Sequence, residues 1–285
     1  MGQESYWASD PSELLRVDEG FVLADVDPSA TPGFDGDKAD GEESLAEGAA
    51  ILAEQQELLF ANSRGGDDPR RILLVLQAMD TAGKGGIVKH VMGSVDPQGV
   101  QVVAFKKPTD EELEHDFLWR IRKATPEAGM IGVFDRSHYE DVLIGRVREL
   151  APADELDRRY DEINEFEREL MAGSTTVIKV MLHISSDEQK ERLQDRLDRP
   201  DKHWKFNPGD IDERMLFPHY QAAYQVVFDR TSTADAPWFV IPADRKWYAR
   251  LAVQHLLIDA LEAMNLEWPR ADYDIEEQKA RLAAT

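Results

Sequence analysis

Residues 71–86 of this chain read Arg71-Ile-Leu-Leu-Val-Leu-Gln-Ala-Met-Asp-Thr-Ala-Gly-Lys-Gly-Gly86 and carry its strongest fold signal. Positions 71–77 form an apolar run, as expected of a strand that is buried on both faces. Three glycines follow within the next turn, and residues 87–92 have an apolar pattern compatible with a helix. The stretch therefore predicts a strand, a glycine-rich turn and a helix, an arrangement suited to holding a phosphate group.

The turn has the features of a phosphate-binding loop, with two departures. Backbone N–H groups of such a turn converge on an anion, and Lys84 adds a positive charge. The common motif is Gly-x-x-x-x-Gly-Lys-Ser/Thr, but Ala78 replaces its first glycine and Gly85 replaces its Mg²⁺-binding hydroxyl. Because phosphate-bound Mg²⁺ needs hard oxygen ligands, we expect Asp80 to supply one, with Thr81 as a weaker candidate. For the loop alone, a turn without a ligand is an equal alternative.

A second strand pattern, residues 130–135, ends in an acid. Asp135 corresponds to the second carboxylate on the Mg²⁺ side of P-loop enzymes. An aspartate here could instead cap the next helix, but the adjacent Arg136 argues against a simple cap. We expect Ser137 to be the N-cap of that helix. His138 has no metal-ligating partner at a suitable spacing, so we expect it to support neighbouring site residues or to be structural, and not to act as a base.

Composition limits the class of protein. The 285 residues contain 42% hydrophobic residues and no cysteine, which excludes disulfides and thiolate metal sites. No apolar run approaches the roughly 20 residues of a membrane helix, and we see no signal peptide, so we expect a cytoplasmic protein. The net charge of −23 argues against binding nucleic acid, which requires a basic surface.

Strand and helix patterns alternate along the chain. Further strands are expected at residues 100–105, 175–184 and 238–241, and helices at residues 110–123, 154–171 and 246–264. This order predicts an α/β fold, a three-layer α/β/α sandwich of the P-loop NTPase type with a mainly parallel five-stranded sheet and a helical lid. Lys106 and Lys107 follow the strand at 100–105, at the edge where ligands bind in such sheets. A solvated turn is the alternative.

The chain divides into three parts by composition. Residues 1–43 hold twelve acids and two bases, which suggests an extended and partly disordered acidic arm. Ser44-Leu-Ala-Glu47 has the pattern of a capping box and should open a helix that ends near residue 63. We assign residues 44–269 to the main P-loop domain, with a lid at about 188–210, and residues 270–285 to an acidic tail.

The lid segment is unusually basic for an acidic protein. Six cationic or potentially cationic residues fall within 14 positions: Arg192, Arg196, Arg199, Lys202, His203 and Lys205. The three arginines share one helical face, and one of them is expected to pair with Glu188, Asp195 or Asp198. Because the pattern breaks at Pro200 and Gly209, it favours a mobile lid that closes on phosphates.

These motifs together resemble the polyphosphate kinases of type 2, P-loop phosphotransferases similar in fold to thymidylate kinase. The resemblance covers about residues 44–269. Arg122 departs from the family, in which many members have histidine, and this places a local nucleotide contact in doubt. The motifs that carry the resemblance are Met79-Asp-Thr-Ala-Gly-Lys-Gly-Gly86, Lys107-Pro-Thr109, Asp116-Phe-Leu-Trp-Arg120, Phe134-Asp-Arg-Ser-His-Tyr-Glu-Asp-Val-Leu143, His203-Trp-Lys-Phe-Asn207 and Pro237-Trp-Phe-Val-Ile-Pro-Ala-Asp-Arg-Lys-Trp-Tyr248.

The resemblance implies phosphoryl transfer between inorganic polyphosphate and a nucleoside mono- or diphosphate (AMP/ADP or GMP/GDP). It implies that Asp80 and Asp135 hold Mg²⁺, with Mn²⁺ as an alternative ion. Lys84, Arg136 and Arg196 would neutralise the transferring group, with Arg192 as the next candidate. It also suggests dimers or tetramers. Phosphate or nucleotide contacts are further expected from Thr81, Ala82, Gly83, Gly85, Gly86, Lys107, Arg120, Arg192, Arg199, Lys202 and Lys205.

Two other functions fit parts of the sequence. An ATP-dependent kinase of the same fold would phosphorylate a nucleotide or nucleoside without polyphosphate. A non-catalytic module that only binds nucleotide or polyphosphate could lack Asp80, Lys84 or Asp135, yet all three are present.

Overall fold

The structure, a computed structural model, describes residues 7–66 and 68–285. Its centre is a five-stranded sheet with the strand order β2-β3-β1-β4-β5, and every neighbouring pair is parallel. This confirms the expected α/β fold. The strands are β1 (Arg71–Ala78), β2 (Val100–Ala104), β3 (Ile131–Asp135), β4 (Thr175–His183) and β5 (Trp238–Pro242).

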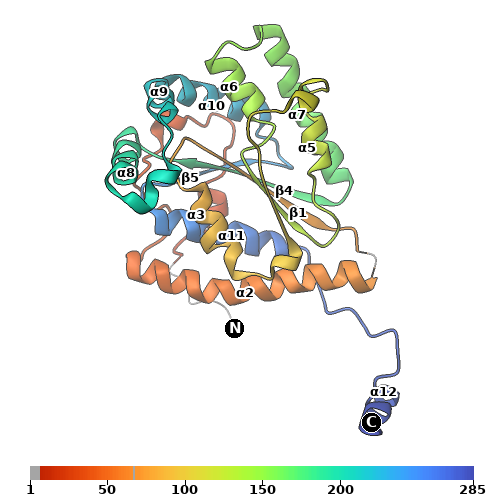
Figure 1. The fold of residues 1–285 in the computed structure, drawn as a ribbon. Coiled ribbons are helices and arrows are strands. Elements are labelled where there is room, and N and C mark those ends of the chain that lie inside the picture. The colour runs from red at the N-terminus through yellow and green to blue at the C-terminus, as the bar shows by residue number, and fades with distance from the viewer. Residues whose placement is uncertain (1–6, 67) are drawn as a thin grey trace.

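Helices cover both faces of the sheet (Figure 1). One layer contains α2 (Lys38–Gly66), α3 (Lys84–His90) and α11 (Lys246–Glu262), and the opposite layer contains α5 (Trp119–Lys123), α6 (Glu140–Val147), α7 (Ala153–Ala172) and α10 (Phe217–Thr231). The lid region follows β4 and consists of α8 (Ser186–Asp198), a 3₁₀ turn η4 (Pro200–Lys205) and α9 (Gly209–Met215). The helix thus stops before Pro200, as expected.

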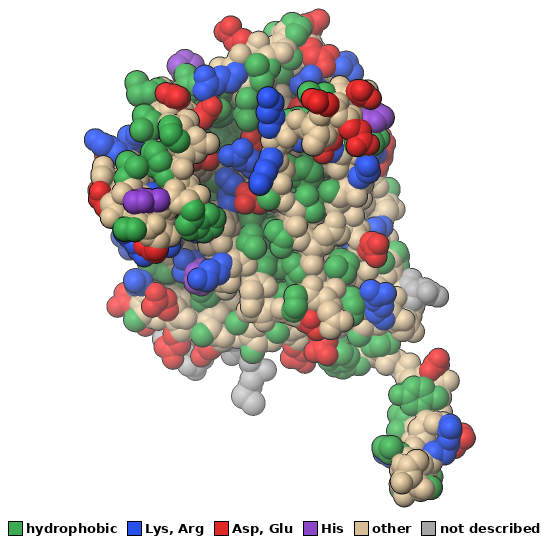
Figure 2. Space-filling view, viewed as in Figure 1, with side chains coloured by type: hydrophobic (Ala, Val, Ile, Leu, Met, Phe, Trp, Pro, Cys, Tyr) green, Lys and Arg blue, Asp and Glu red, His purple; other side chains and the backbone are tan. Residues whose placement is uncertain are grey.

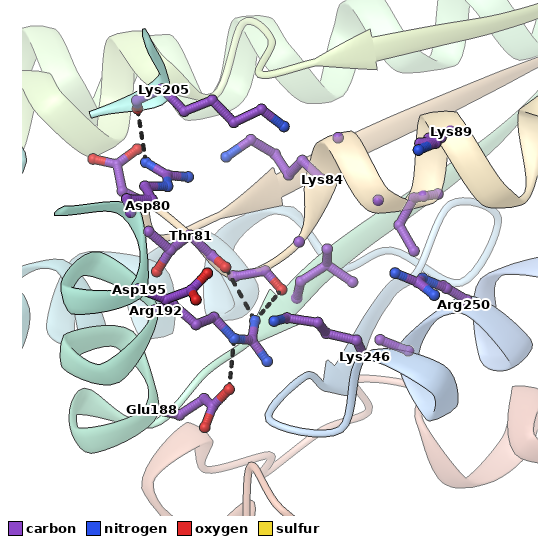
Figure 3. Close-up of a pocket in the computed structure, with 18 of the residues that line it drawn as sticks. Asp80, Thr81, Lys84, Lys89, Glu188, Arg192, Asp195, Lys205, Lys246 and Arg250 are labelled. Atoms are coloured by element: carbon purple, nitrogen blue, oxygen red, sulfur yellow. Dashed lines mark hydrogen bonds and ion pairs between the residues drawn. The ribbon is translucent and has the colours of Figure 1, made fainter. Parts of the chain in front are cut away.

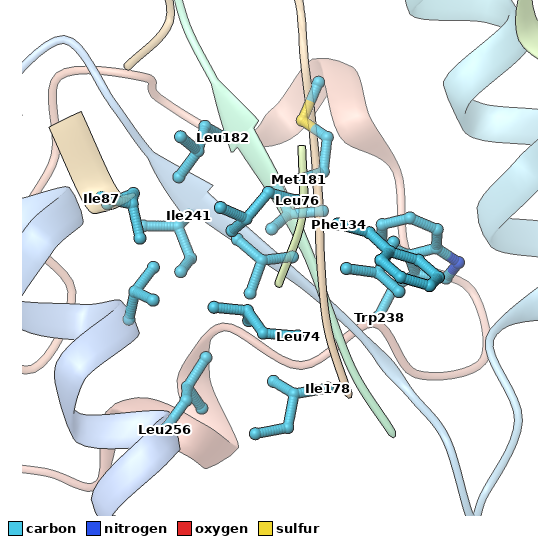
Figure 4. Close-up of a cluster of buried hydrophobic side chains, with 14 of the residues drawn as sticks. Leu74, Leu76, Ile87, Phe134, Ile178, Met181, Leu182, Trp238, Ile241 and Leu256 are labelled. Atoms are coloured by element: carbon cyan, nitrogen blue, oxygen red, sulfur yellow. The ribbon is translucent and has the colours of Figure 1, made fainter. Parts of the chain in front are cut away.

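The central strand owes its position to its composition. Residues 72–77 of β1 are all buried, because neighbouring strands flank it and helices cover both faces. Aliphatic side chains of β1, β4 and β5 pack together with Phe134 and Trp238 in one cluster (Figure 4). This rigid core fixes the strand ends, from which the loops of the candidate site extend.

Helices α2 and α11 approach each other unusually closely. A β-carbon at Gly41 would lie 2.3 Å from the ring of Trp247, and one at Gly48 would lie 2.2 Å from the Gln254 side chain. Only glycine fits against the rigid Trp247 ring, so Gly41 sets how near the helices lie, whereas at Gly48 the end of the Gln254 side chain would have to shift. The close contact holds α11 in place beside the P-loop helix α3.

The N-terminal segment is more ordered than the sequence suggested. Leu15, Val17, Leu23 and Phe34 are buried. The Val17 amide donates to the Trp238 carbonyl at 2.8 Å, and the Val240 amide donates to the Leu15 carbonyl at 2.8 Å. The segment therefore covers the open edge of β5 with a short antiparallel pairing, and the prediction of a partly disordered arm is wrong for residues 7–37.

Several helix boundaries differ from the expected ones. Helix α2 begins at Lys38 rather than at Ser44, because the Asp37 carboxylate accepts from the amides of Ala39 and Asp40 at 2.7 and 3.2 Å and so caps it earlier. The single helix expected at 110–123 is two short ones, α4 (Asp110–Leu113) and α5, separated by a turn in which Asp116 accepts from the Leu118 amide.

The chain ends in a short helix that stands away from the body of the protein. Helix α12 (Ile275–Ala283) has no buried residue, and Figure 1 shows it beyond an extended linker. In the described part of the chain, no helix is long and apolar enough to cross a membrane.

Candidate active site

A single cavity collects most of the predicted site residues. It has a volume of about 820 Å³ and is lined by the loop after β1, the end of β3, the lid helix α8, the turn η4 and the start of α11. All of these segments lie where parallel strands end, which is where open α/β sheets bind ligands. Figure 2 shows Lys and Arg side chains gathered in the hollow beside the lid, while acidic side chains gather mainly toward the upper and lower edges of this face.

The P-loop has the backbone geometry of a tight anion-binding turn. Gly83 has φ = +128°, a conformation that only glycine adopts without strain, and helix α3 begins at the next residue. Thr81 also has a positive φ of +66°. The Lys84 Nζ donates to the Ala78 carbonyl at 3.2 Å, which holds the side chain across the loop and leaves its other protons for a ligand. Figure 3 shows Lys84 and Lys205 extending into the same space.

The two expected metal-binding carboxylates line the same cavity. Asp80 lies in the loop after β1, and Asp135 ends β3 opposite Leu76 of β1. The Arg136 Nη2 lies 3.3 Å from Asp80 Oδ1. Burial alone would lower the pKa of Arg136, but the carboxylates of Glu140, Asp80 and Asp135 outweigh it and raise the pKa. Arg136 is therefore a permanently charged link between these acids.

Glu140 is a neighbour of this centre that the sequence analysis did not assign. Burial raises its pKa, and the positive charges of Arg136 and Lys84 oppose that rise. The Gln77 carboxamide is best oriented with its nitrogen donating to Glu140 Oε1 at 2.9 Å and its oxygen accepting from Ser137 Oγ at 3.0 Å. Ser137 is thus buried in this chain of bonds. Helix α6 begins at Glu140 with Tyr139 at the N-cap position, two residues later than predicted. The Ser137 hydroxyl still accepts from the Tyr139 amide at 3.2 Å, so it satisfies one backbone donor at the entry to the helix.

A buried polar network anchors the loop between β3 and α6. The Lys179 Nζ donates to Glu167 Oε2 at 2.6 Å and to the Thr231 carbonyl at 2.7 Å. The Tyr139 hydroxyl donates to Glu167 Oε1 at 2.7 Å, and His138 Nε2 lies 3.3 Å from the same oxygen. These side chains are completely or almost completely buried, which confirms the structural role expected for His138.

The lid arginine Arg192 has a different environment from the one we expected. Its Nε donates to Glu188 at 2.7 Å, its Nη1 donates to the carbonyls of Thr81 and Ala82, and its Nη2 donates to those of Ala243 and Asp244, all at 2.7–3.0 Å. All five N–H groups of the guanidinium are thereby used. Arg192 therefore fastens α8 to the P-loop and to the loop after β5, and it offers no free donor to a phosphate. The bond to Glu188 confirms the expected pairing within the helix.

The remaining lid cations line the cavity. The Arg196 Nη1 donates to the Lys205 carbonyl at 3.0 Å and lies 3.3 Å from Asp210 Oδ2. Arg199 follows the last residue of α8 in an extended conformation and pairs with Asp201 at 2.9 Å. Lys202 and Lys205 also face the cavity. The lid thus contributes several positive charges at one side of the P-loop.

Two expected contacts lie outside this cavity. Lys107 is exposed in the turn after β2 and is not among the cavity-lining residues. The Arg120 Nη1 donates to the Lys106 carbonyl at 2.9 Å and lies 3.5 Å from Glu112, so this side chain braces the turn. In this conformation neither reaches the P-loop cavity.

Three cations that line the cavity had no assigned role in the sequence analysis. Lys89 lies on α3, and Lys246 and Arg250 lie at the start of α11 (Figure 3). Burial lowers the pKa of Lys246, and the nearby positive charge of Arg192 adds to this effect. The signal that could have found Lys246 is its position directly after β5, at the same sheet edge as the P-loop.

The donor set suits a hard divalent cation. Asp80 and Asp135 supply carboxylate oxygens, the ligand type that Mg²⁺ prefers. The hydroxyl oxygen of Thr81 is buried and has no hydrogen-bond partner among the described residues. The oxygens present therefore fit Mg²⁺, and the chain has no cysteine thiolate to favour a softer metal.

The fold and the cavity together define a P-loop phosphotransferase, that is, a kinase-type enzyme. The parallel sheet brings a glycine-rich loop with lysine, two carboxylates and a cationic lid to the same edge. The comparison with protein families then gives the particular family. The chain belongs to the polyphosphate kinase 2 (PPK2) family, whose model matches residues 37–269.

Individual relatives support this membership. The chain is 44% identical over 258 residues to the AMP/ADP-polyphosphate phosphotransferase of Meiothermus ruber, a match that covers 90% of this chain and 95% of the relative. It is 40% identical to the ADP-polyphosphate phosphotransferase of Rhodopseudomonas palustris, over 89% of each chain. Among solved structures, the polyphosphate kinase 2 of Arthrobacter aurescens TC1 superposes with a TM-score of 0.96 at 59% identity and covers 98% of both chains.

Proposed function

We propose that this protein transfers a phosphoryl group between inorganic polyphosphate and a nucleoside mono- or diphosphate, AMP/ADP or GMP/GDP, with Mg²⁺ as the metal ion. Membership of the polyphosphate kinase 2 family supports this proposal, as do the names of the relatives, which act on AMP, ADP and polyphosphate.

The single observation that carries the proposal is the charge of the cavity. Five acids and ten cations line it, although the whole chain has a net charge of −23. Phosphate groups of one nucleotide occupy only a few cations, whereas a linear chain of phosphates can contact cations along the full length of the cavity. Arg192 contributes its charge only, because all its donors are bonded to protein; the other nine are Lys84, Lys89, Arg136, Arg196, Arg199, Lys202, Lys205, Lys246 and Arg250.

The chemistry requires positioning and neutralisation of charge more than covalent participation. Phosphoryl transfer passes through a loose transition state with charge spread over the phosphoryl oxygens. Asp80 and Asp135 would hold Mg²⁺, which would neutralise phosphate charge and orient the reacting groups. Lys84, Arg136 and Arg196 would stabilise the charge on the transferring group, because they line the same cavity as both carboxylates.

The lid would close over the bound phosphates. Residues of about 188–210 carry Arg196, Arg199, Lys202 and Lys205, and closure would exclude water that could otherwise hydrolyse the phosphoryl donor. Arg192 would serve as the fixed attachment of this lid to the P-loop. We also propose that the family's dimers or tetramers extend to this protein.

The test is an assay with defined donors. Purified protein is incubated with long-chain polyphosphate, Mg²⁺ and one acceptor at a time (AMP, ADP, GMP or GDP), and newly phosphorylated nucleotide is measured by chromatography. We expect product only when polyphosphate is present, and less of it when EDTA removes the metal. A parallel reaction with ATP as the only donor separates the alternatives, because product formed there at the same rate would identify an ATP-dependent kinase. Binding without any product would identify a non-catalytic module.

A further inference from the structure

Two arginines one turn apart on α8 differ in how many of their donors are free. Arg192 uses all five N–H groups in bonds to protein acceptors. Arg196 is bonded through Nη1 alone, and within residues 7–66 and 68–285 its Nε and Nη2 have no hydrogen-bond partner. Its side chain is 24% exposed and lines the cavity. One edge of the Arg196 guanidinium is thus held by protein, and the other is available to a ligand.

Two oxygens hold the bonded edge, and one of them belongs to a carboxylate. The Arg196 Nη1 lies 3.0 Å from the Lys205 carbonyl and 3.3 Å from Asp210 Oδ2. Asp210 comes from the second residue of α9, so this ion pair joins the two helices of the lid.

Asp210 is itself firmly placed. Its side chain is only 15% exposed. Its amide donates to the Asn207 carbonyl at 2.8 Å, and its Oδ2 also accepts from the Asn207 amide at 3.4 Å. The Gly209 amide donates to Asn207 Oδ1 at 3.0 Å, which tightens the same turn. A carboxylate fixed in a turn is a suitable anchor for a long side chain.

We infer that Asp210 is a positioning residue that holds the Arg196 guanidinium so that Nε and Nη2 face the transferring phosphoryl group. The physical reason is preorganisation: a donor that is already oriented needs no rearrangement when charge develops in the transition state. The inference rests on the proposed function, because it needs Arg196 to contact that group.

A competing role for Asp210 has the opposite consequences. Its negative charge could occupy Arg196 until a substrate phosphate displaces it, in which case Asp210 would weaken ground-state binding. Positioning affects kcat and leaves the KM values nearly unchanged, whereas competition affects KM for polyphosphate. The two roles are therefore separable by kinetics.

The experiment is a double-mutant cycle in the full-length protein with Asp210→Asn, Arg196→Ala and the double variant. Asp210→Asn keeps the size of the side chain and removes its charge. Asp212→Asn is the matched control, because Asp212 is an exposed acid on the same helix with no hydrogen bond or ion pair to any described residue. Initial rates are measured against polyphosphate and against nucleotide, and thermal melts check that all four variants remain folded.

We expect Asp210→Asn to lower kcat about tenfold with both KM values within about twofold of the wild type. In the Arg196→Ala background the same substitution should have no further effect, since the group that it positions is gone. Asp212→Asn should behave as the wild type. Additive effects in the cycle, or a lower KM for polyphosphate at unchanged kcat, would overturn the inference. If the wild type shows no polyphosphate-dependent transfer, the proposed function is rejected instead. The same double-mutant cycle is then run on ATP-driven transfer. There too, Asp210 is a positioning residue only if Asp210→Asn has no further effect in the Arg196→Ala background.

Discussion

Replacing Arg192 with alanine should destabilise the whole protein, although this arginine lies in the lid of the cavity. The substitution leaves four backbone carbonyls without their donor, two in the P-loop and two after β5, and leaves the Glu188 carboxylate unpaired. The side chain is only 7% exposed, so water replaces the guanidinium poorly.

The size of the effect follows from this burial. Removing one partner of a buried, hydrogen-bonded charge typically costs about 3–5 kcal/mol. For a chain of 285 residues the entropy of unfolding is about 0.6 kcal/mol per kelvin, at roughly 2.1 cal/mol/K for each residue. The melting temperature of Arg192→Ala should therefore fall by about 5–8 °C.

Arg196→Ala is the matched control, because the residue type, the helix and the cavity are the same. Its guanidinium is more exposed and uses a single nitrogen for protein contacts, so the loss of stability should stay below about 1 kcal/mol, or about 2 °C. Melts followed by circular dichroism, with urea titrations as a second measure, give both values. A melting temperature of Arg192→Ala within 2 °C of the wild type, together with a raised KM for polyphosphate, would show that Arg192 contacts phosphate and does not act as a structural clamp.

Three further predictions concern other parts of the molecule. Asp80→Asn should lower turnover by about two orders of magnitude at saturating Mg²⁺ while the melting temperature changes little; an unchanged rate would transfer the metal-binding role to Thr81. Lys179→Met should cost about 3–5 kcal/mol of stability in urea titrations, because the buried Glu167 carboxylate loses the ammonium group that donates to its Oε2, and adding Glu167→Gln should restore part of it; full stability of the single variant would contradict this. Burial alone would lower the pKa of His255, but the carboxylates of Asp259 and Asp10 outweigh it and raise the pKa above 6.5. Its stabilising effect is therefore complete below about pH 6.5 and fades as the pH rises through the folded-state pKa, so the stability difference between wild type and His255→Gln should shrink over that range.

Local sequence was sufficient to predict the sheet and to select four residues that line one cavity. The apolar run of β1, the glycines after it and the acid that ends β3 each act within a few residues of their own position. The tendency to form a strand or a turn, and the choice of residue types that can bind a metal, depend on such short-range patterns. Asp80, Lys84, Asp135 and Arg136 could therefore be proposed together before any packing was known.

Tertiary structure decided which hydrogen-bond donors of the lid arginines are free. Arg192 and Arg196 are the same residue type four positions apart, so helical periodicity places them on one face and cannot tell them apart. At Arg192, α8 packs against the P-loop and the loop after β5, and backbone carbonyls of both loops accept from the guanidinium. At Arg196, the same helix faces the cavity, so part of the guanidinium stays free.

Contacts between segments that are distant in the sequence also decided the structure of the N-terminal segment and the position of α11. The Asp37 carboxylate accepts from the Ala39 amide and so caps α2, which begins earlier than the expected Ser44. Residues 15–17 pair with strand β5, more than 200 positions away in the sequence. Lys246 and Arg250 line the cavity from α11, a helix that packs against α2 at Gly41 and Gly48 and lies beside α3. Sequence reports what each segment favours by itself, whereas contacts between distant segments determine which charges remain free for a ligand.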